Sequence, residues 1–294
     1  MRVFVTGATG FIGSRVVEEM IGAGHKVLGL SRSDAGADFL ARAGAEVHRG
    51  DLEDLGSLRS GAAKSDAVIH IAFRHDWTKF AESCAMDKRA IEVLGTELEG
   101  SHRPLLVSAG AASPVQGRAA TEEDPPIPPT DQFPRASEPT ALSFVERGVN
   151  ASVVRLPQVH DTVKQGLVSY LIALAREKGV SPYIGEGRNR WAAAPVQDVA
   201  RLYRLALEKN EAGARYNAVA EEGVPLRDIA EVIGQGLKVP VVSMSPGEAP
   251  GHFGFLAMFA GRDLLVSSKL TQERLDWHPT GPGLIADLKN MRYA

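Results

Sequence analysis

Cysteine is nearly absent from this chain of 294 residues, which contains only Cys84. One cysteine cannot form an intrachain disulfide, so we expect a reduced, cytoplasmic protein whose fold needs no such bond. In the stretch FAESCAMDKRA, Cys84 is expected to pack inside a helix rather than to serve as a reactive thiol.

Long apolar runs and a large excess of one charge are also lacking. No apolar run approaches the ~18 residues that a membrane-spanning helix needs, and the apolar strand RVFVTG starts at Arg2, so we expect no leader sequence. Lys and Arg number 33 against 36 Asp and Glu, which argues against a nucleic-acid or membrane partner. Without cysteine pairs or closely spaced histidines we expect no metal site, and without a Gly-x-Ser-x-Gly motif no hydrolase of that type.

The chain instead shows a regular alternation of strands and helices over residues 1–110. Short apolar strands are predicted at 2–7, 25–33, 46–51, 66–73 and 103–110, separated by helical repeats at 11–24, 34–45, 52–62 and 79–98. Asp34 is the predicted N-cap of the second helix. Strands that alternate with helices predict right-handed crossovers and a parallel sheet, and therefore an α/β fold.

Residues 111–134 interrupt this alternation with six prolines and no periodicity, which predicts a long functional loop. A helix at 137–148 and a strand at 150–157 then resume the pattern. We expect a first domain over 1–160, completed by about 192–219, and a smaller lobe formed by 161–191 and 220–294.

Three glycines, Gly7, Gly10 and Gly13, lie at the first strand-to-helix junction. Such a junction directs backbone N–H groups and the positive end of a helix dipole to one point, where a pyrophosphate can approach the bare backbone. The spacing predicts a dinucleotide site, also lined by Thr9, Phe11 and Ile12. A purely structural turn is the alternative.

The end of the second strand bears on which dinucleotide is bound. It reads Ser31-Arg32-Ser33, without the acidic residue that usually holds the ribose 2′-hydroxyl of NAD. Arg32 suits a 2′-phosphate, and the two serines can add hydrogen bonds. The sequence therefore predicts NADP, with an ordinary solvated arginine as the alternative.

The segment TGATGFIGS at 6–14 resembles the cofactor turn of extended and atypical short-chain dehydrogenases/reductases of the epimerase/dehydratase type. Further segments resemble that family in the same order: GDLED (50–54), HIAF (70–73), LLVSAG (105–110), VVRLPQVHD (153–161) and PVQDVARLYRLALE (195–208). The resemblance implies a Rossmann-like, doubly wound parallel sheet of about seven strands and a smaller C-terminal substrate lobe. It also implies cofactor contacts at Asp51, Leu52, Ile71, Ala72, Phe73, Val107, Pro157 and Val159.

The chain departs from the family at its catalytic residues. The family uses a tyrosine, a lysine four residues later and a serine or threonine, which together move a proton while hydride passes to or from the nicotinamide. In this sequence those positions fall at Pro134, Glu138 and Gly110. All five tyrosines (Tyr170, Tyr183, Tyr203, Tyr216 and Tyr293) lie beyond this helix, and none begins a Tyr-x-x-x-Lys motif.

Other groups must then stabilise or protonate a developing anion, and we consider Ser108, Arg135 and His160. Arg135 can act as an electrostatic clamp, although an ion pair with Glu138, three residues away, is at least as plausible. His160 follows the loop that faces the nicotinamide and can titrate near neutral pH, or can be a hydrogen-bonded loop residue. Ser108 can equally be a structural residue at a strand end.

The substrate pocket is expected to involve Ser113 in the proline loop, and Trp191 and Phe253 from the later part of the chain. The apolar stretch GHFGFLAMFAG at 251–261 suits a pocket wall, with a buried helix of the lobe as the alternative.

These observations favour an NADP(H)-dependent oxidoreductase that reduces a carbonyl or imine of a small, fairly apolar substrate. A nonenzymatic NADP(H)-binding redox sensor is the main alternative, because the tyrosine and the lysine are missing. A nucleotide-sugar epimerase or dehydratase with other catalytic residues is a weaker one. The resemblance to this family also leaves room for a homodimer.

Overall fold

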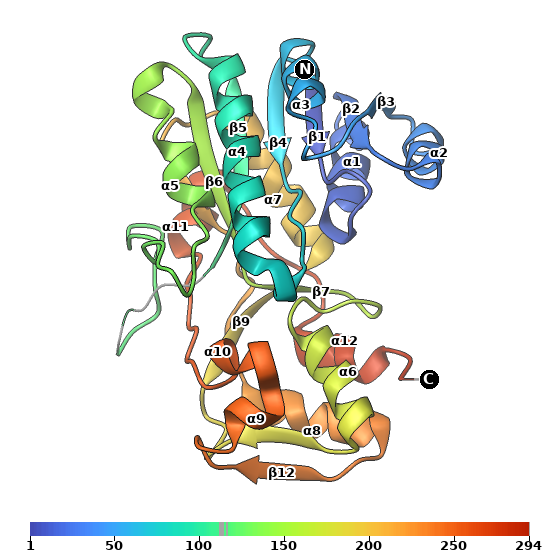
Figure 1. The fold of residues 1–294 in the computed structure, drawn as a ribbon, viewed down its shortest axis with the longest axis vertical. Coiled ribbons are helices and arrows are strands. Elements are labelled where there is room, and N and C mark those ends of the chain that lie inside the picture. Colours follow the sequence, from blue (N-terminus) through green and yellow to red (C-terminus); the bar gives the residue numbers. More distant parts are fainter. Residues whose placement is uncertain (112–114, 116, 294) are drawn as a thin grey trace.

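The computed structural model describes residues 1–111, 115 and 117–293. Figure 1 shows a large domain in which helices surround a central sheet, and a smaller lobe beneath it that contains the C-terminus. The N-terminus lies at the far end of the large domain, so the first strand runs toward the lobe.

The central sheet has seven parallel strands in the order β10-β6-β5-β4-β1-β2-β3. This confirms the predicted doubly wound, Rossmann-like sheet. The strand order reverses between β1 and β4, and in such sheets ligands bind at the carboxyl edge of this switch point. The strands are β1 (Arg2–Thr6), β2 (Lys26–Ser31), β3 (Glu46–Arg49), β4 (Ala67–His70), β5 (Pro104–Gly110), β6 (Asn150–Leu156) and β10 (Arg215–Asn217).

Side chains of β1 alternate between two apolar cores, as the period of a strand requires. Val3 and Val5 belong to the core under α1, α2 and α7, whereas Phe4 packs in the opposite core under α3, α4 and α5. A sheet covered by helices on both faces explains why its strands are almost continuously apolar. The helices are α1 (Phe11–Gly22), α2 (Asp34–Arg42), α3 (Leu55–Ala63), α4 (Phe80–Leu98), α5 (Ser137–Leu142) and α7 (Val196–Lys209).

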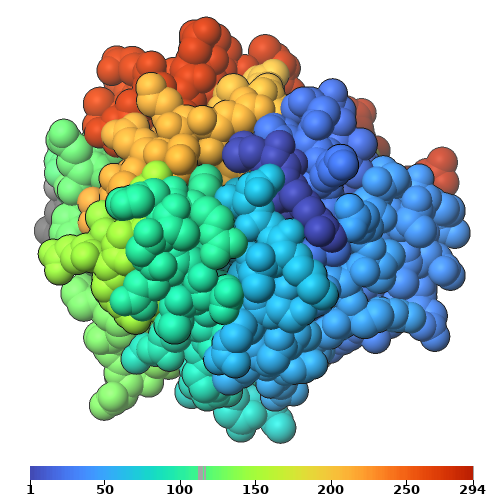
Figure 2. Space-filling model, turned by 90° about the horizontal axis from the view of Figure 1, so that it is seen from above, coloured from blue at the N-terminus to red at the C-terminus, as the bar shows by residue number. Residues whose placement is uncertain are grey.

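Helix α7 returns from the later part of the chain to pack beside α1, as the resemblance implied. Figure 2 shows the end of the domain away from the lobe, where the blue N-terminal segments lie against the orange segments beyond residue 200. The large domain is therefore formed by segments that are far apart in sequence.

The smaller lobe has its own apolar core, around Leu171, Trp191, Ile229 and Leu284. A three-stranded sheet, β11-β9-β7, joins it to the large domain, and β12 pairs with β8 in parallel at its far end. No helix within the described residues is both long and apolar enough to cross a bilayer. Its elements are β7 (Gln158–His160), α6 (Val168–Lys178), β8 (Ser181–Ile184), β9 (Arg190–Pro195), β11 (Glu221–Pro225), α8 (Leu226–Leu237), β12 (Val241–Met244) and α12 (Leu284–Asn290).

Residues 251–261 lie in broken helical turns rather than one buried helix. They include parts of α9 (Ala249–Phe253), η3 (Gly254–Leu256) and α10 (Ala257–Ala260). Gly254 has a φ of 54°, a left-handed conformation that ends α9. Because of this break, Phe253 and Leu256 enter the core of the lobe while Phe255 and Phe259 stay half-buried.

Candidate active site

The glycine turn between β1 and α1 brings two strand ends into close contact. Gly7 has a φ of 70°, and a Cβ there would lie 2.7 Å from the backbone nitrogen of Ala72, just beyond β4. A Cβ on Gly13 would lie 2.0 Å from the carbonyl oxygen of Gly7. The first glycine therefore permits contact between the turn and the segment after β4, and the last permits α1 to pack on the turn.

The N-terminus of α1 is open to an anion. Gly10 is its N-cap and donates a hydrogen bond to the carbonyl of Gly7 (2.9 Å), while no side chain of the described residues caps the helix and its first turn is free of acidic residues. Thr9 and Gly10 are exposed, and Phe11 and Ile12 are half-buried. Uncapped N–H groups beside side-chain-free backbone fit the pyrophosphate of a dinucleotide.

The end of β2 presents Arg32 to solvent, with 81% of its side chain exposed. Its Nη1 lies 3.8 Å from Oδ2 of Asp51, a residue carried there by the loop after β3. Ser31 donates from its Oγ to the carbonyl of Ser33 (3.0 Å). The prediction that Asp34 caps α2 is wrong, because the Oγ of Ser33 accepts the hydrogen bond from Gly36 N (3.1 Å) and Ser33 is the N-cap.

The other residues expected at the cofactor lie along the same carboxyl edge or in the strands behind it. Ala72 N donates to Thr6 Oγ1 at 3.4 Å, which fixes the segment after β4 against β1. Val107 in β5 and Val159 in β7 are buried. Leu52, Ile71, Phe73 and Pro157 are half-buried.

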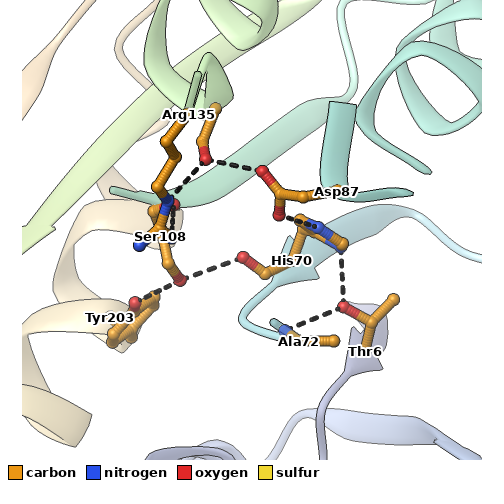
Figure 3. A network of polar contacts seen from close by, with 8 residues as sticks. Thr6, His70, Ala72, Asp87, Ser108, Arg135 and Tyr203 are labelled. Atoms are coloured by element: carbon orange, nitrogen blue, oxygen red, sulfur yellow. Dashed lines mark hydrogen bonds and ion pairs between the residues drawn. The ribbon is translucent and has the colours of Figure 1, made fainter. Parts of the chain in front are cut away.

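A buried polar network crosses the sheet at this edge (Figure 3). Thr6 Oγ1 lies 2.8 Å from His70 Nδ1, and His70 Nε2 lies 3.2 Å from Asp87 Oδ1 on α4. Ser137 donates to Asp87 Oδ2 at 2.6 Å. Burial alone would raise the pKa of Asp87, but the hydrogen bond and charge of His70, with Arg135 and Ser137, hold that pKa below its ordinary value. His70 is thus an interior residue with a hydrogen-bond partner at each ring nitrogen.

Arg135 lies at the open end of this network. Its Nε donates to Ser137 Oγ (3.0 Å), and its Nη2 lies 3.5 Å from the carbonyl oxygen of Ser108. The guanidinium carbon stacks 4.3 Å from the centroid of the Phe73 ring. Phe73 follows Ala72, which contacts Gly7, so the network holds a half-buried cation beside the glycine turn.

Ser108 joins the network from β5 but is fully engaged by neighbours. Its Oγ donates to the carbonyl of His70 (2.9 Å) and lies 2.6 Å from the hydroxyl of Tyr203, which then donates to it. Burial raises the pKa of Tyr203 well above its usual range, only partly offset by Ser108 and Arg135, so the phenol stays protonated. Ser108 and Tyr203 tie β4, β5 and α7 together.

Comparison with known proteins agrees with this geometry. The model of the NAD dependent epimerase/dehydratase family matches residues 3–219, which include the glycine turn, the network and α7. The chain belongs to this family. An uncharacterized protein of Schizosaccharomyces pombe is 47% identical over 296 residues and spans 100% of both chains.

Two further similarities to this epimerase/dehydratase chain have lower sequence identity. Sterol-4-alpha-carboxylate 3-dehydrogenase, decarboxylating, of Dictyostelium discoideum is 27% identical over 243 residues, 76% of this chain and 73% of that protein. The crystal structure of DesIV, a dTDP-glucose 4,6-dehydratase of Streptomyces venezuelae with NAD and TYD bound, matches with a TM-score of 0.77. It covers 99% of this chain and 95% of that one at 19% identity, so the likeness concerns the fold. The more distant relative is thus named as a dehydrogenase, and the structure of similar fold is named as a dehydratase with NAD bound.

In this epimerase/dehydratase chain, the position expected for the catalytic lysine is occupied by Glu138, which forms ion pairs with two arginines. Glu138 is buried, and its Oε1 lies 2.7 Å from both Arg155 Nη2 and Arg215 Nε. The alternative ion pair between Arg135 and Glu138 is therefore wrong, since Glu138 turns toward β6 and β10. Arg155 also donates to the carbonyls of Thr121 (3.2 Å) and Asp124 (2.8 Å), so this ion cluster anchors the proline loop.

His160 lies outside the polar network. It is fully buried in β7, and its Nδ1 lies 2.7 Å from Asp287 Oδ2 on α12. Its Nε2 has no hydrogen-bond partner among the described residues. The contact joins β7 to the C-terminal helix.

The residues expected in the substrate pocket are not brought together at the surface. Trp191 is fully buried and donates from Nε1 to the carbonyl of Phe259 (3.3 Å), and Phe253 is 3% exposed. Both belong to the core of the lobe. Ser113 lies outside the described residues.

Sequence reasoning missed a group of half-buried rings beside Arg135. We call it the aromatic cluster; it consists of Phe73, Trp77, Phe80, Phe133, Tyr170, Phe255 and Phe259. The closely spaced rings of FRHDWTKF at 73–80 were a local signal for it. Of the rings from the lobe, Phe255 and Phe259 lie in the stretch 251–261 that the sequence analysis considered as a pocket wall, whereas Tyr170 had no such signal.

Lys164 was also missed. Its Nζ lies 6.0 Å from the centroid of the Phe11 ring, at the start of α1. The turn that carries it is ordered by Asp161, whose Oδ1 accepts from Val163 N (2.7 Å) and Lys164 N (2.8 Å). Desolvation, followed by the charges of Arg135 and Lys164, lowers the pKa of His75.

Proposed function

We propose that this protein is an NADP(H)-dependent oxidoreductase that reduces a carbonyl or imine of a small apolar substrate. The observation that carries the proposal is the placement of Arg135, a cation held by Ser137 beside Phe73 and the glycine turn. The uncapped start of α1 would hold the pyrophosphate, and the exposed guanidinium of Arg32 would hold the 2′-phosphate.

A bound NADPH would supply hydride, with its two electrons, to the carbonyl carbon and leave as NADP⁺. The carbonyl π bond breaks and negative charge develops on oxygen, where the guanidinium of Arg135 stabilises it. Arginine does not deprotonate at neutral pH, so a proton from solvent completes the hydroxyl.

Two features separate this proposal from a nonenzymatic NADP(H) sensor. Pro134 and the buried ion cluster of Glu138 replace the family's proton-transfer pair, which favours the sensor. The half-buried guanidinium of Arg135 favours catalysis, because its Nη1 makes no hydrogen bond within the described residues and is free for a substrate.

The test follows NADPH oxidation by absorbance over a panel of aldehydes, ketones and cyclic imines, with NADH in parallel. Arg135→Gln is expected to lower kcat/KM by about 100-fold or more, with NADPH affinity within about twofold, and Arg135→Lys to restore part of the rate. Arg147 is a matched control, because its guanidinium also stacks 4.3 Å over a phenylalanine, Phe144, away from the glycine turn.

Full activity of Arg135→Gln would refute the role of Arg135. Absence of turnover on every compound, with NADPH bound more tightly than NADP⁺, would favour the sensor instead.

A further inference from the structure

The aromatic cluster spans the junction between the large domain and the lobe. Trp77, in η1 (Trp77–Lys79), stacks on Phe80 of the large domain, with centroids 5.2 Å apart and planes at 24°. Its other stacked partner is Phe255 of the lobe, at 4.6 Å and 15°. Tyr170 and Phe259 meet the indole edge-on, at 6.2 Å and 6.0 Å.

These rings do not form part of a folding core. Phe73, Trp77, Phe80 and Phe133 lie outside the apolar cores described above, and the three lobe rings lie only at the border of one. All of them remain half-buried. A contiguous group of partly exposed aromatic side chains is unusual on a protein surface and is typical of ligand sites.

The cluster also contains an unused hydrogen-bond donor. Trp77 Nε1 is enclosed and lacks a hydrogen-bond partner among the described residues. An enclosed N–H without an acceptor is destabilising, and an acceptor atom of a ligand would remove that cost. Arg135, stacked on Phe73, provides a cation at the end of the cluster nearest the glycine turn.

Charged groups around the cluster limit the chemistry of the ligand. The ring centroid of His75 lies 5.1 Å from that of Phe73, and desolvation, followed by the charges of Arg135 and Lys164, lowers the pKa of His75 and disfavours its charged form. The Oδ1 of Asp76 accepts hydrogen bonds from the backbone nitrogen and the hydroxyl of Thr78, and its Oδ2 lies 3.8 Å from Nη2 of Arg74. The site therefore offers ring faces, one N–H donor and the cation of Arg135, which suits a planar ring that bears an oxygen acceptor.

We propose that the aromatic cluster is the substrate-recognition site and that it selects aryl carbonyl compounds, in which a planar aromatic ring carries the carbonyl group to be reduced. When the aryl ring of a ligand displaces Phe255 from the face of Trp77, the stack between Trp77 and Phe255 is lost and a stack between Trp77 and the ligand forms. The free-energy cost of opening the junction between the large domain and the lobe is therefore small. Trp77 Nε1 and Arg135 orient its oxygen. This inference rests on the proposed reductase function for turnover but not for binding.

Binding is tested by tryptophan fluorescence, because Trp191 and Trp277 are fully buried while Trp77 is half-buried. The protein with NADP⁺ is titrated with benzaldehyde and with cyclohexanecarbaldehyde, which has a ring of similar size without π electrons. We expect saturable quenching by benzaldehyde and loss of the signal in Trp77→Phe. Cyclohexanecarbaldehyde should bind about twofold to twelvefold more weakly, as ring stacking is worth about 0.5–1.5 kcal/mol.

Turnover gives a second readout. Phe255→Leu keeps an apolar side chain but removes the ring, and should lower the benzaldehyde preference in kcat/KM by about threefold to tenfold. Phe39→Leu on α2 is the matched control and should leave the preference unchanged.

Equal binding of both aldehydes, or quenching that persists in Trp77→Phe, would overturn the inference. Reduction of both aldehydes without preference would overturn it and leave the reductase function standing. Selective quenching at Trp77 without turnover of any carbonyl compound would support the aryl site and refute the reductase function.

Discussion

The carboxylate of Glu138 lies 2.7 Å from the guanidinium of Arg155, and both side chains are buried. Arg215 shares the same carboxylate oxygen from the neighbouring strand. The position where relatives are expected to carry a catalytic lysine is thus occupied by the anion that balances two arginines. The first prediction follows from this relationship.

Restoring the lysine by Glu138→Lys should destabilise the protein instead of improving activity. Three cations would then share a buried site, and loss of one partner of a buried ion pair costs about 3–5 kcal/mol. Urea unfolding at neutral pH measures the change. Glu146→Lys, at an exposed position of η2 (Val145–Arg147), is the control and should change stability by less than about 0.5 kcal/mol. A stable and more active Glu138→Lys variant would contradict the assignment.

Two glycines of α1 should respond oppositely to alanine. Gly13→Ala places a Cβ 2.0 Å from the carbonyl oxygen of Gly7, so the turn must shift, with loss of NADPH binding and about 1–3 kcal/mol of stability. Gly22→Ala meets no atom within 4 Å and should be neutral or stabilising by up to about 1 kcal/mol. Calorimetric NADPH titration and thermal unfolding of both variants check this. Equal behaviour of the two variants would refute the packing role of Gly13.

Arg32→Ala should change the choice between cofactors. Hydrogen bonds to a charged group contribute about 1.5–3 kcal/mol, so the dissociation constant of NADPH should rise roughly tenfold to 100-fold while that of NADH stays within twofold. Arg42→Ala, at the far end of α2, serves as the control. Equal weakening of both cofactors would show that Arg32 does not read the 2′-phosphate.

Asp87 should contribute stability that depends on pH. Its folded-state pKa lies below the unfolded value, about 4 for a free carboxyl, because His70, Arg135 and Ser137 favour the anion. Its contribution is therefore complete above about pH 5 and is lost as pH falls through the folded-state pKa. Asp87→Asn should lower the free energy of unfolding at pH 7 by about 1–3 kcal/mol. Below about pH 5, the free energy of unfolding of this variant should fall less steeply with decreasing pH than that of the wild type. Asp38→Asn, at an exposed position of α2, should preserve the wild-type slope.

The sequence by itself determined the fold class, the glycine turn between β1 and α1, and the residues at the positions where the family's tyrosine and lysine are expected. These features depend on local patterns: strand-to-helix alternation, glycines at a junction where only a bare backbone fits, and the identity of residues at positions 134 and 138. The resemblance of residues 195–208 to the family implied that α7 returns to the first domain, and it packs there beside α1.

Only the tertiary structure decided which side chains meet. Glu138 was expected near Arg135 because they are three residues apart, but burial of its carboxylate made partners on β6 and β10 more favourable. Trp77 and Phe255 are separated by most of the chain, and no local periodicity relates them. Contacts of this kind depend on how the lobe folds back on the sheet, and the stack of Trp77 on Phe255 exists only after that packing is complete.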